Sequence, residues 1–419
     1  MTQKWLVFII LIECLSGIAV SGQTTRPVTI QQFLKAALVR HPSVRLYQKL
    51  QEQKAAETRS LKAETLPKID YTLTGANYHY TPYRYRTLEN GFVLTWEAHK
   101  WLGKLKQLGI AGEEIAKIQA RQNRLELIWE VKEAFYQLIR VRQEQRIVAV
   151  SEAYLQHHLM VSQGLFRVGQ IDQLDLYRTQ AALAAAQEAV TTAKNKWRQW
   201  QIRLQNLTGL TVSEADSLAL QPGELIVPAV SLDTLMAEVR RTNPALALLE
   251  QQIHETELRE RLVRAGWLPT VAISGGFVLD NDPTSGGNYA VIQGGLQLPL
   301  VDWRQRKNKA ESFRLHRQSL VETQKVLLLD IRTRLQQLLA QQGYLKSLQV
   351  LKAKTLLQAA QAYFLTEKSY KAGLATNTDV LLAQKEWIQA RLSQENIRLQ
   401  LRLTNSKFDL LIGRTGVSK

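Results

Sequence analysis

The sequence has almost no cysteine, and this shortage limits the chemistry it can carry. Its 419 residues contain one cysteine, Cys14. Cys14 lies within residues 1–22, where Lys4, an apolar stretch and a small-residue site at 19–21 follow the pattern of a secretory signal peptide. Glu13, directly before Cys14, argues against lipid attachment there. After cleavage no cysteine would remain, which excludes disulfides, thiol catalysis and thiolate metal sites.

Histidine is also scarce, and neither the seven histidines nor the glycine pairs form a catalytic or cofactor pattern. The neighbours His157 and His158 would point about 100° apart on a helix and would share a metal ion poorly. Gly275-Gly276 and Gly294-Gly295 lie in strand-like sequence, where they relieve crowding rather than hold phosphate. No nucleophile-elbow, nucleotide-binding or zinc-protease motif occurs. We expect no catalysis, no cofactor and no bound metal.

Long apolar runs are missing as well. No stretch beyond residue 22 approaches the roughly 20 apolar residues of a membrane-spanning helix. Lysine and arginine number 54 against 37 acidic residues, for a net charge of +17. The basic residues are mixed with Glu and Gln along helical stretches, which favours solvated helix faces over a nucleic-acid surface. A nucleic-acid-binding function would have to be supported by DNA binding that weakens steeply as the salt concentration rises.

The sequence does contain an internal duplication. Three pairs of residues recur 202 positions apart: Pro42 and Pro244, Pro67 and Pro269, Trp101 and Trp303. Spacing held over that distance indicates two copies of one structural unit. We expect a first repeat at 23–210 and a second at 231–419. Residues 211–230, which contain Pro222, Gly223 and Pro228, form the linker between them.

Each repeat begins with two short helical stretches and then changes its apolar period from 3.6 to 2. Ile69, Tyr71 and Leu73 alternate with polar residues after Pro67, and a similar alternation follows Pro269. These patterns predict β-hairpins at about 68–97 and 270–300. Their strands, of roughly 9–11 residues, have the length needed to cross a bilayer when tilted.

Very long helices follow each predicted hairpin. Residues 113–163 and 170–208 contain no Gly or Pro. The second copy has corresponding runs at roughly 303–366, interrupted only at Gly343, and at 374–412. A run of about 60 residues would be on the order of 90 Å long. The turns between paired helices are predicted at 164–175 and 368–379. There Gly169 and Gly373 end one helix, and the polar residues that follow cap the next.

Three aspartates directly follow these turns: Asp172, Asp175 and Asp379. In an oligomer they would form rings of carboxylates, which select ions or hold a gate at a constriction. Alternatively, each aspartate only caps the returning helix at the positive end of its dipole. The sequence leaves both readings open.

Four membrane strands cannot close a barrel, because known barrels have about eight or more. If these strands cross a membrane, several chains must share one barrel; otherwise they are soluble hairpins packed on helices. The aromatic residues that are candidates for interfacial girdles are Tyr71, Tyr78, Tyr80, Tyr83, Trp96, Trp101, Phe277, Tyr289 and Trp303. Trp101 and Trp303, at matching junctions, are placed on the periplasmic side.

With these parts in order, the whole mature chain resembles the TolC-like outer-membrane efflux proteins. The junction 298–306 (LPLVDWRQR) and the tip Tyr370…Gly373-Leu374…Asp379-Val380 carry the resemblance together with the duplication. The first repeat departs from the pattern, since its junction at 95–101 lacks the proline and its tip lacks the Gly-Leu pair.

The resemblance implies a mainly helical trimer in which two β-hairpins per chain build a 12-stranded outer-membrane β-barrel, continued by a periplasmic α-barrel. It implies a passive exit duct that docks through its tips on a periplasmic adaptor linked to an inner-membrane pump. The tip residues expected to meet the adaptor are Arg167, Gly169, Lys371, Gly373 and Leu374. The alternative function is a secreted or periplasmic coiled-coil scaffold that conducts nothing.

Overall fold

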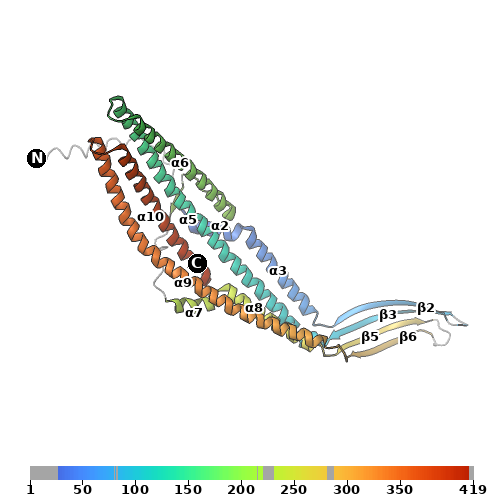
Figure 1. Ribbon diagram of the computed structural model, residues 1–419. Coiled ribbons are helices and arrows are strands. Elements are labelled where there is room, and N and C mark those ends of the chain that lie inside the picture. The colour runs from blue at the N-terminus through green and yellow to red at the C-terminus, as the bar shows by residue number, and fades with distance from the viewer. Residues whose placement is uncertain are drawn as a thin grey trace, which may run out of the picture.

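The computed structural model describes residues 27–79, 81, 84–214, 216–219, 231–280 and 287–414. The predicted signal peptide with Cys14, the aromatics Tyr80 and Tyr83, and most of the predicted linker lie outside these residues. The described chain is elongated, with a helical array at one end and a four-stranded sheet at the other (Figure 1).

Six helices form the array. The longest are α5 (Leu105–Arg167, 63 residues) and α9 (Gln305–Lys371, 67 residues), and each turns back into a helix of 36 residues, α6 (Gln173–Thr208) and α10 (Asn377–Ile412). The shorter helices α3 (Pro42–Ala63) and α8 (Pro244–Ala265) extend the rows of α6 and α10 toward the sheet. Neighbouring contacts give the lateral order α3 with α6, then α5, then α8 with α10, then α9.

Local sequence explains where these helices start and stop. Pro42 and Pro244 occupy the first turns of α3 and α8, where a missing backbone N–H costs nothing. The Oδ1 of Asn243 accepts hydrogen bonds from the backbone N–H groups of Ala245 and Leu246, at 2.9 and 3.1 Å. At the far end, Gly413 closes α10 with φ of 84°.

The sheet has the order β2-β3-β5-β6 and is antiparallel throughout. Its strands are β2 (Lys68–His79), β3 (Arg84–Glu97), β5 (Thr270–Asp280) and β6 (Tyr289–Gln297). The first hairpin is longer than the expected 9–11 residues per strand, with 12 and 14 residues. The repeats join where β3 pairs with β5, and the outer edges of β2 and β6 are left without a strand partner among the described residues.

A small second layer covers one face of the array. It comprises α2 (Ile30–Arg40), α7 (Leu232–Thr242) and a two-stranded parallel sheet of β1 (Pro27–Thr29) and β4 (Ser217–Ala219). Strand β4 falls inside the segment predicted to be only a linker, so that part of the linker is built into the second layer. A further short helix, α4 (Ala98–Leu102), separates β3 from α5.

The core lies between this layer and the array. Phe33 of α2 packs on Phe135 of α5 with ring centroids 5.6 Å apart. Leu235 of α7 packs in a second cluster with Leu335 of α9 and Phe408 of α10. Arg121 of α5 donates a hydrogen bond to the backbone carbonyl of Thr242 at the end of α7 at 3.2 Å. Because Arg121 precedes Phe135 by 14 residues, the two lie about 40° apart around α5, so α7 is linked to α5 on the side that α2 covers.

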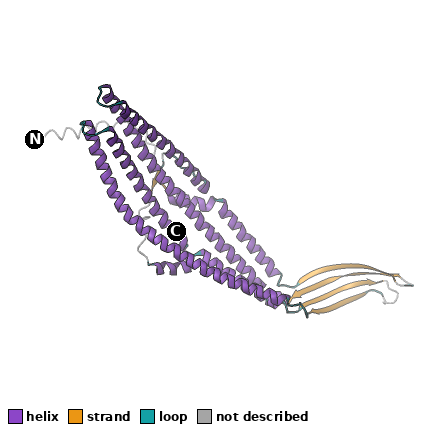
Figure 2. Cartoon of the chain, viewed as in Figure 1, coloured by secondary structure: helices purple, strands orange, loops and turns teal. Residues whose placement is uncertain are grey.

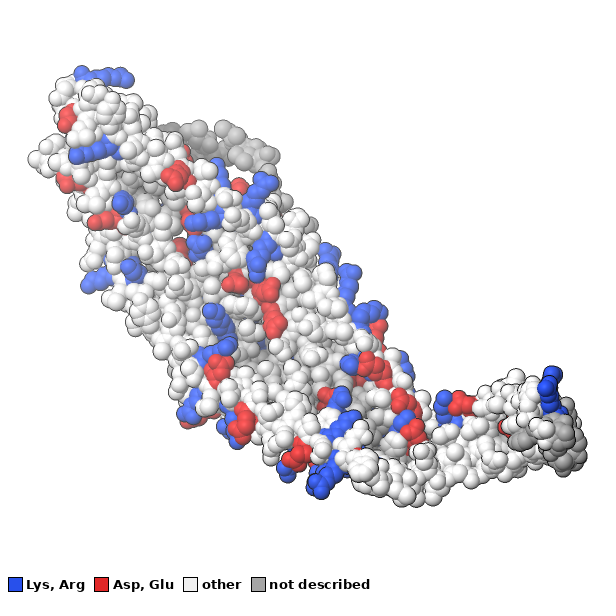
Figure 3. Space-filling model, turned by 45° about the vertical axis from the view of Figure 1, so that its right-hand side comes forward, with Lys and Arg blue, Asp and Glu red and all other residues white. Residues whose placement is uncertain are grey.

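Charged side chains are distributed along the helices with both signs mixed, whereas the face of the sheet in view is nearly free of them (Figure 3). Among the described residues, no helix combines the length and the apolar character needed to cross a membrane. The predicted fold class of a single chain, duplicated long helical hairpins with two β-hairpins, is confirmed.

Candidate gate at the helical tips

The two predicted helical turns lie together at the end of the molecule farthest from the sheet (Figure 2). One connects α5 to α6 and the other connects α9 to α10. Gly169 and Gly373 take φ of 74° and 72°, the left-handed region that glycine adopts without strain. Both turns are therefore tight, and each places a polar residue at the start of the returning helix.

Two of the three aspartates after the turns, Asp172 and Asp379, cap their helices. Asp172 Oδ1 accepts a hydrogen bond from the backbone N–H of Asp175 at 2.8 Å. In the second repeat Thr376 and Asp379 form a reciprocal capping box: Asp379 N–H donates to Thr376 Oγ1 at 3.2 Å, and Thr376 N–H donates to Asp379 Oδ2 at 2.9 Å. Hydrogen bonds from Thr376 lower the pKa of Asp379. Capping is thus observed for Asp172 and Asp379, while the Asp175 carboxylate pairs with Arg178 instead. A gating role stays a prediction for all three.

A buried asparagine ties the two tips together. Asn377 is 1% exposed, and its side-chain amide donates to the backbone carbonyl of Asp175 at 2.9 Å. Its Oδ1 lies 2.7 Å from His158 Nε2 and 3.2 Å from Thr179 Oγ1. An amide oxygen only accepts, so His158 donates through Nε2–H. One side chain of the second repeat thus holds three residues of the first.

A second, exposed contact supports this tie. Arg178 Nη1 lies 3.3 Å from Asp175 Oδ1 and donates to Thr378 Oγ1 at 3.2 Å. Because solvent screens exposed ion pairs, this contact contributes less than the buried one. Asp175, one of the predicted site residues, therefore meets the second repeat directly through its backbone and indirectly through Arg178.

His158 lies in a partly apolar site formed by both repeats. Its ring centroid is 5.2 Å from that of Tyr370, a side chain that is 6% exposed. Burial lowers the pKa of His158, although the hydrogen bond to Asn377 and the charge of Glu367 oppose the shift. The tie is thus made by neutral His158 at neutral pH.

The sequence reading missed His158, Thr179, Arg178 and the role of Asn377. It treated the histidines as surface or core residues, because their spacing gave no metal pattern. The one available signal was position, since His158 and Asn377 each lie within a few turns of a predicted tip.

The residues predicted to meet a partner are exposed at this end. Arg167, Gly169, Lys371 and Gly373 are all exposed, and Leu374 is 83% exposed at the outermost turn. Lys371 pairs with Glu367 one turn back, with Nζ 2.8 Å from the carboxylate oxygen.

The candidate interfacial aromatics differ in their surroundings. Trp303 is 90% exposed and Trp101 60% exposed, both at junctions between strand and helix. Trp96 is half-buried, and its indole N–H donates to the carbonyl of Thr65 at 3.2 Å. Apolar side chains that point out of the sheet include Ile69, Tyr71, Leu73, Phe92, Ile273, Phe277, Ile292 and Leu296.

The part of the chain that the structure describes contains no group of three or more His, Cys, Asp or Glu residues placed to hold a metal ion.

Comparison with known proteins agrees with this architecture. A family model described as outer membrane efflux protein matches residues 33–210 and 235–414. The pyoverdine export outer membrane protein OpmQ of Pseudomonas putida is 21% identical over 296 residues, or 68% of this chain. The chain aligns with 61% of the length of OpmQ.

Solved structures share the fold. CusC superposes with a TM-score of 0.81 at 13% identity, covering 94% of both chains. The outer-membrane channel OprN gives a TM-score of 0.81 at 16% identity, over 92% of this chain and 89% of its own. Both matches concern fold alone, whereas the family model spans most of the chain in two stretches. The chain belongs to the outer membrane efflux protein family.

Proposed function

We propose that this chain is one protomer of a trimeric exit duct in the bacterial outer membrane, a passive channel for solutes leaving the cell. The observation that carries the proposal is that the sheet and the helical array are both open at the same two sides. One side is formed by β2, α3 and α6, and the other by β6 and α9.

Both open sides carry exposed apolar side chains. Leu46 of α3 and Ile202 of α6 are 56% and 48% exposed on one side, and Val326 and Leu329 of α9 are each 65% exposed on the other. A head-to-tail contact between unlike sides closes into a ring when the rotation allows it. Three copies would supply 12 strands, within the range of known barrels. Closure would also pair the edge backbone N–H and C=O groups of β2 with those of β6 of the next copy. Each such group costs several kcal/mol if it has no hydrogen-bond partner in lipid.

The sheet's outward apolar residues support insertion in the outer membrane, with the helices extending into the periplasm. We propose that the exposed tips, at Arg167, Gly169, Lys371, Gly373 and Leu374, dock on a periplasmic adaptor that links the duct to an inner-membrane pump. OpmQ is named for pyoverdine export, and at 21% identity this supports export of solutes without selecting one. Substrate choice would reside in the pump.

The tips would act as the gate in this proposal. Asn377, His158 and the Asp175 carbonyl tie the two hairpins of a protomer, and trimer symmetry would place Asp175 and Asp379 three times around the periplasmic mouth. Opening would require the two hairpins to separate at these contacts.

The test combines mass by light scattering with single-channel conductance in a planar bilayer, on protein purified in detergent. We expect a trimer with discrete pores, and a conductance that changes in Asp175→Ala and Asp379→Ala. Pores unaffected by both substitutions would leave the duct and reduce Asp379 to a helix cap and Asp175 to a partner of Arg178. A protein that is soluble without detergent and forms no pore would refute the duct and favour the coiled-coil scaffold.

A further inference from the structure

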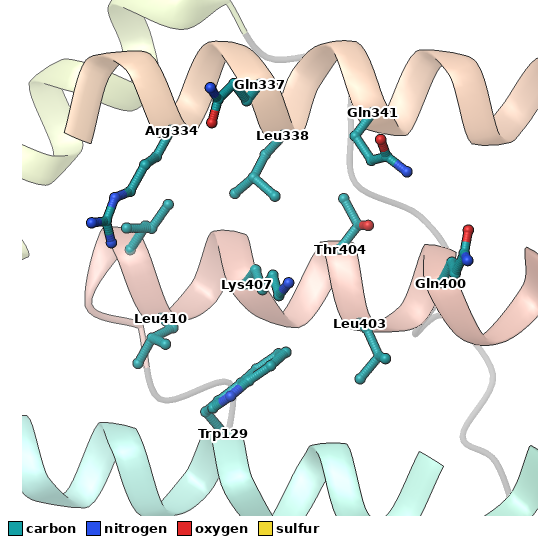
Figure 4. Close-up of a pocket in the computed structure, with 11 residues that line it drawn as sticks. Trp129, Arg334, Gln337, Leu338, Gln341, Gln400, Leu403, Thr404, Lys407 and Leu410 are labelled. Atoms are coloured by element: carbon teal, nitrogen blue, oxygen red, sulfur yellow. The ribbon is translucent and has the colours of Figure 1, made fainter. Parts of the chain in front are cut away.

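A pocket of 610 Å³ opens between α5, α9 and α10, next to the cluster that α7 forms with the array (Figure 4). Trp129 enters it from α5, Lys407 from α10, and Arg334 with Gln337 from α9. Three helices that are far apart in the sequence thus meet around one space.

The pocket opens on the face away from α2 and α7. Gln337 follows the buried Leu335 by two residues, which turns it about 200° around α9 from the α7 side. Trp129 precedes Phe135, the contact of α2, by six residues and lies about 120° away on α5. In the proposed duct this face is the inner wall, because a second layer on the inside would obstruct the passage. The assignment of this face to the inner wall rests on the proposed function.

The chemistry of the pocket is aromatic and cationic. Lys407 Nζ lies 5.8 Å from the centroid of the Trp129 ring. Lys407 is exposed and makes no ion pair within the described part of the chain, whereas Arg334 shares its charge with Asp330 at 2.9 Å. None of the 11 lining residues is acidic, and three of them are glutamines: Gln337, Gln341 and Gln400.

These groups complement one class of ligand. The indole face offers stacking to a flat ring, the ammonium attracts an anionic group attached to that ring, and the glutamine amides supply hydrogen bonds around it. A cationic ligand would meet two positive charges and no carboxylate among the lining side chains. The lining side chains therefore favour an anionic ligand over a cationic one.

We propose that this pocket is a transient binding site on the inner wall for aromatic anions, meaning conjugated carboxylates or sulfonates, during export. The chain has a net charge of +17, and we infer that it attracts anionic cargo through single cations without an ion pair among the described residues, such as Lys407, rather than through a uniform field. Because the pocket opens on the side of the proposed lumen, a bound anion can leave it directly into the passage.

Binding is tested with pyranine, a fluorescent pyrene trisulfonate that stays out of lipid, added at low salt to the full-length protein in lipid nanodiscs. Two variants change only exposed groups: Lys407→Gln removes the cation, and Gln341→Glu adds an anion to the pocket. Lys346→Gln is the matched control, since Lys346 is an exposed lysine of α9, about 60° from Ile331 and on the α7 side. Fluorescence anisotropy gives the dissociation constant of each protein.

We expect Lys407→Gln and Gln341→Glu each to weaken pyranine binding about five-fold, and Lys346→Gln to change it less than about two-fold. Equal losses in Lys407→Gln and Lys346→Gln, or no loss in either pocket variant, would overturn the site. Mass and conductance are measured on the same preparations. Normal pores with unchanged pyranine affinity refute the pocket alone. Pocket-specific binding in a protein without pores overturns its placement on an inner wall, and the duct with it.

Discussion

Asn377 concentrates the polar contacts between the two repeats, so its removal should release the tips. Asn377→Ala deletes the hydrogen bonds to the Asp175 carbonyl and to His158. Each is worth about 1 kcal/mol, so we expect the open fraction of single channels to rise by roughly ten-fold. Asn396→Ala is the matched control, because Asn396 is exposed on the same helix. Equal open fractions in Asn377→Ala and the unmodified protein would show that the tie does not hold the gate.

His158 makes the stability of the tips depend on pH. Its pKa in the folded protein is lowered from an ordinary value of 6.5, chiefly by burial. The unfolded chain therefore takes up the proton first as the pH falls. Stability is full above the unfolded pKa and is lost as the pH falls from 6.5 through the lowered folded value.

We expect the melting temperature to drop between about pH 7 and about pH 5, and to drop less in His158→Gln, whose amide keeps a donor for Asn377 without titrating. The groups that face His158 are His157, Tyr370, Glu367, Lys371 and Asn377, of which Glu367 and the Asn377 bond favour protonation. Parallel pH profiles for the two proteins would assign the drop to other groups.

The helix caps could be predicted from the sequence, whereas the contacts of Asn377 with the first repeat could not. Asp379 and Thr376 are three residues apart, and their capping box can be recognised from that spacing. The contact from Asn377 to Asp175 joins residues 202 positions apart. No local pattern encodes such a contact, because it depends on how two hairpins pack side by side.

Among the strands, the pairing of β3 with β5 depends on two facing glycines. Gly91 is the register partner of Gly276, and a Cβ on Gly276 would lie 2.5 Å from the carbonyl oxygen of Asn90. We expect Gly276→Ala to destabilise the sheet by about 1–3 kcal/mol, measured as a lower urea midpoint of the refolded protein. Gly294→Ala, in the same sheet, meets no described atom within 4 Å and should be close to neutral. Equal midpoints for the two variants would refute this close approach.

Helices and strands could be predicted where a periodic pattern of apolar residues extends over many positions. Their ends were harder to predict. The alternation after Pro67 and Pro269 indicated both hairpins. Helix α5, however, continues through Gly109, Gly112 and Gly164, which lie outside the helical run expected at 113–163. A single glycine costs only about 1 kcal/mol in a helix, and packing along 63 residues offsets it. At Gly109 the missing side chain lets α3 approach, since a Cβ there would lie 3.0 Å from Thr58.

For the molecule as a whole, the sequence predicted two repeats but not the layer that covers them. Strands β1 and β4 are three residues each, too short for any periodicity, and they pair across most of the first repeat. Helix α7 was expected as one of the two short helical stretches at the start of the second repeat, yet its place on α9 and α10 follows only from packing around Leu335. What the order of elements does determine is which sides of the protomer remain open.

Those open sides provide a test of ring closure. Leu329 lies two residues before the buried Ile331, about 200° around α9 from its packed face, and is 65% exposed. If it is buried against the next copy, Leu329→Glu would place a carboxylate in an apolar contact three times per ring, at a cost of several kcal/mol. We expect light scattering in detergent to show monomers with an unchanged helix content by circular dichroism. Met160→Glu is the control. Met160 is 62% exposed, and its helix α5 lies between α6 and α10, away from both open sides. A trimer that survives Leu329→Glu would mean that α9 faces lipid or water rather than a neighbouring copy.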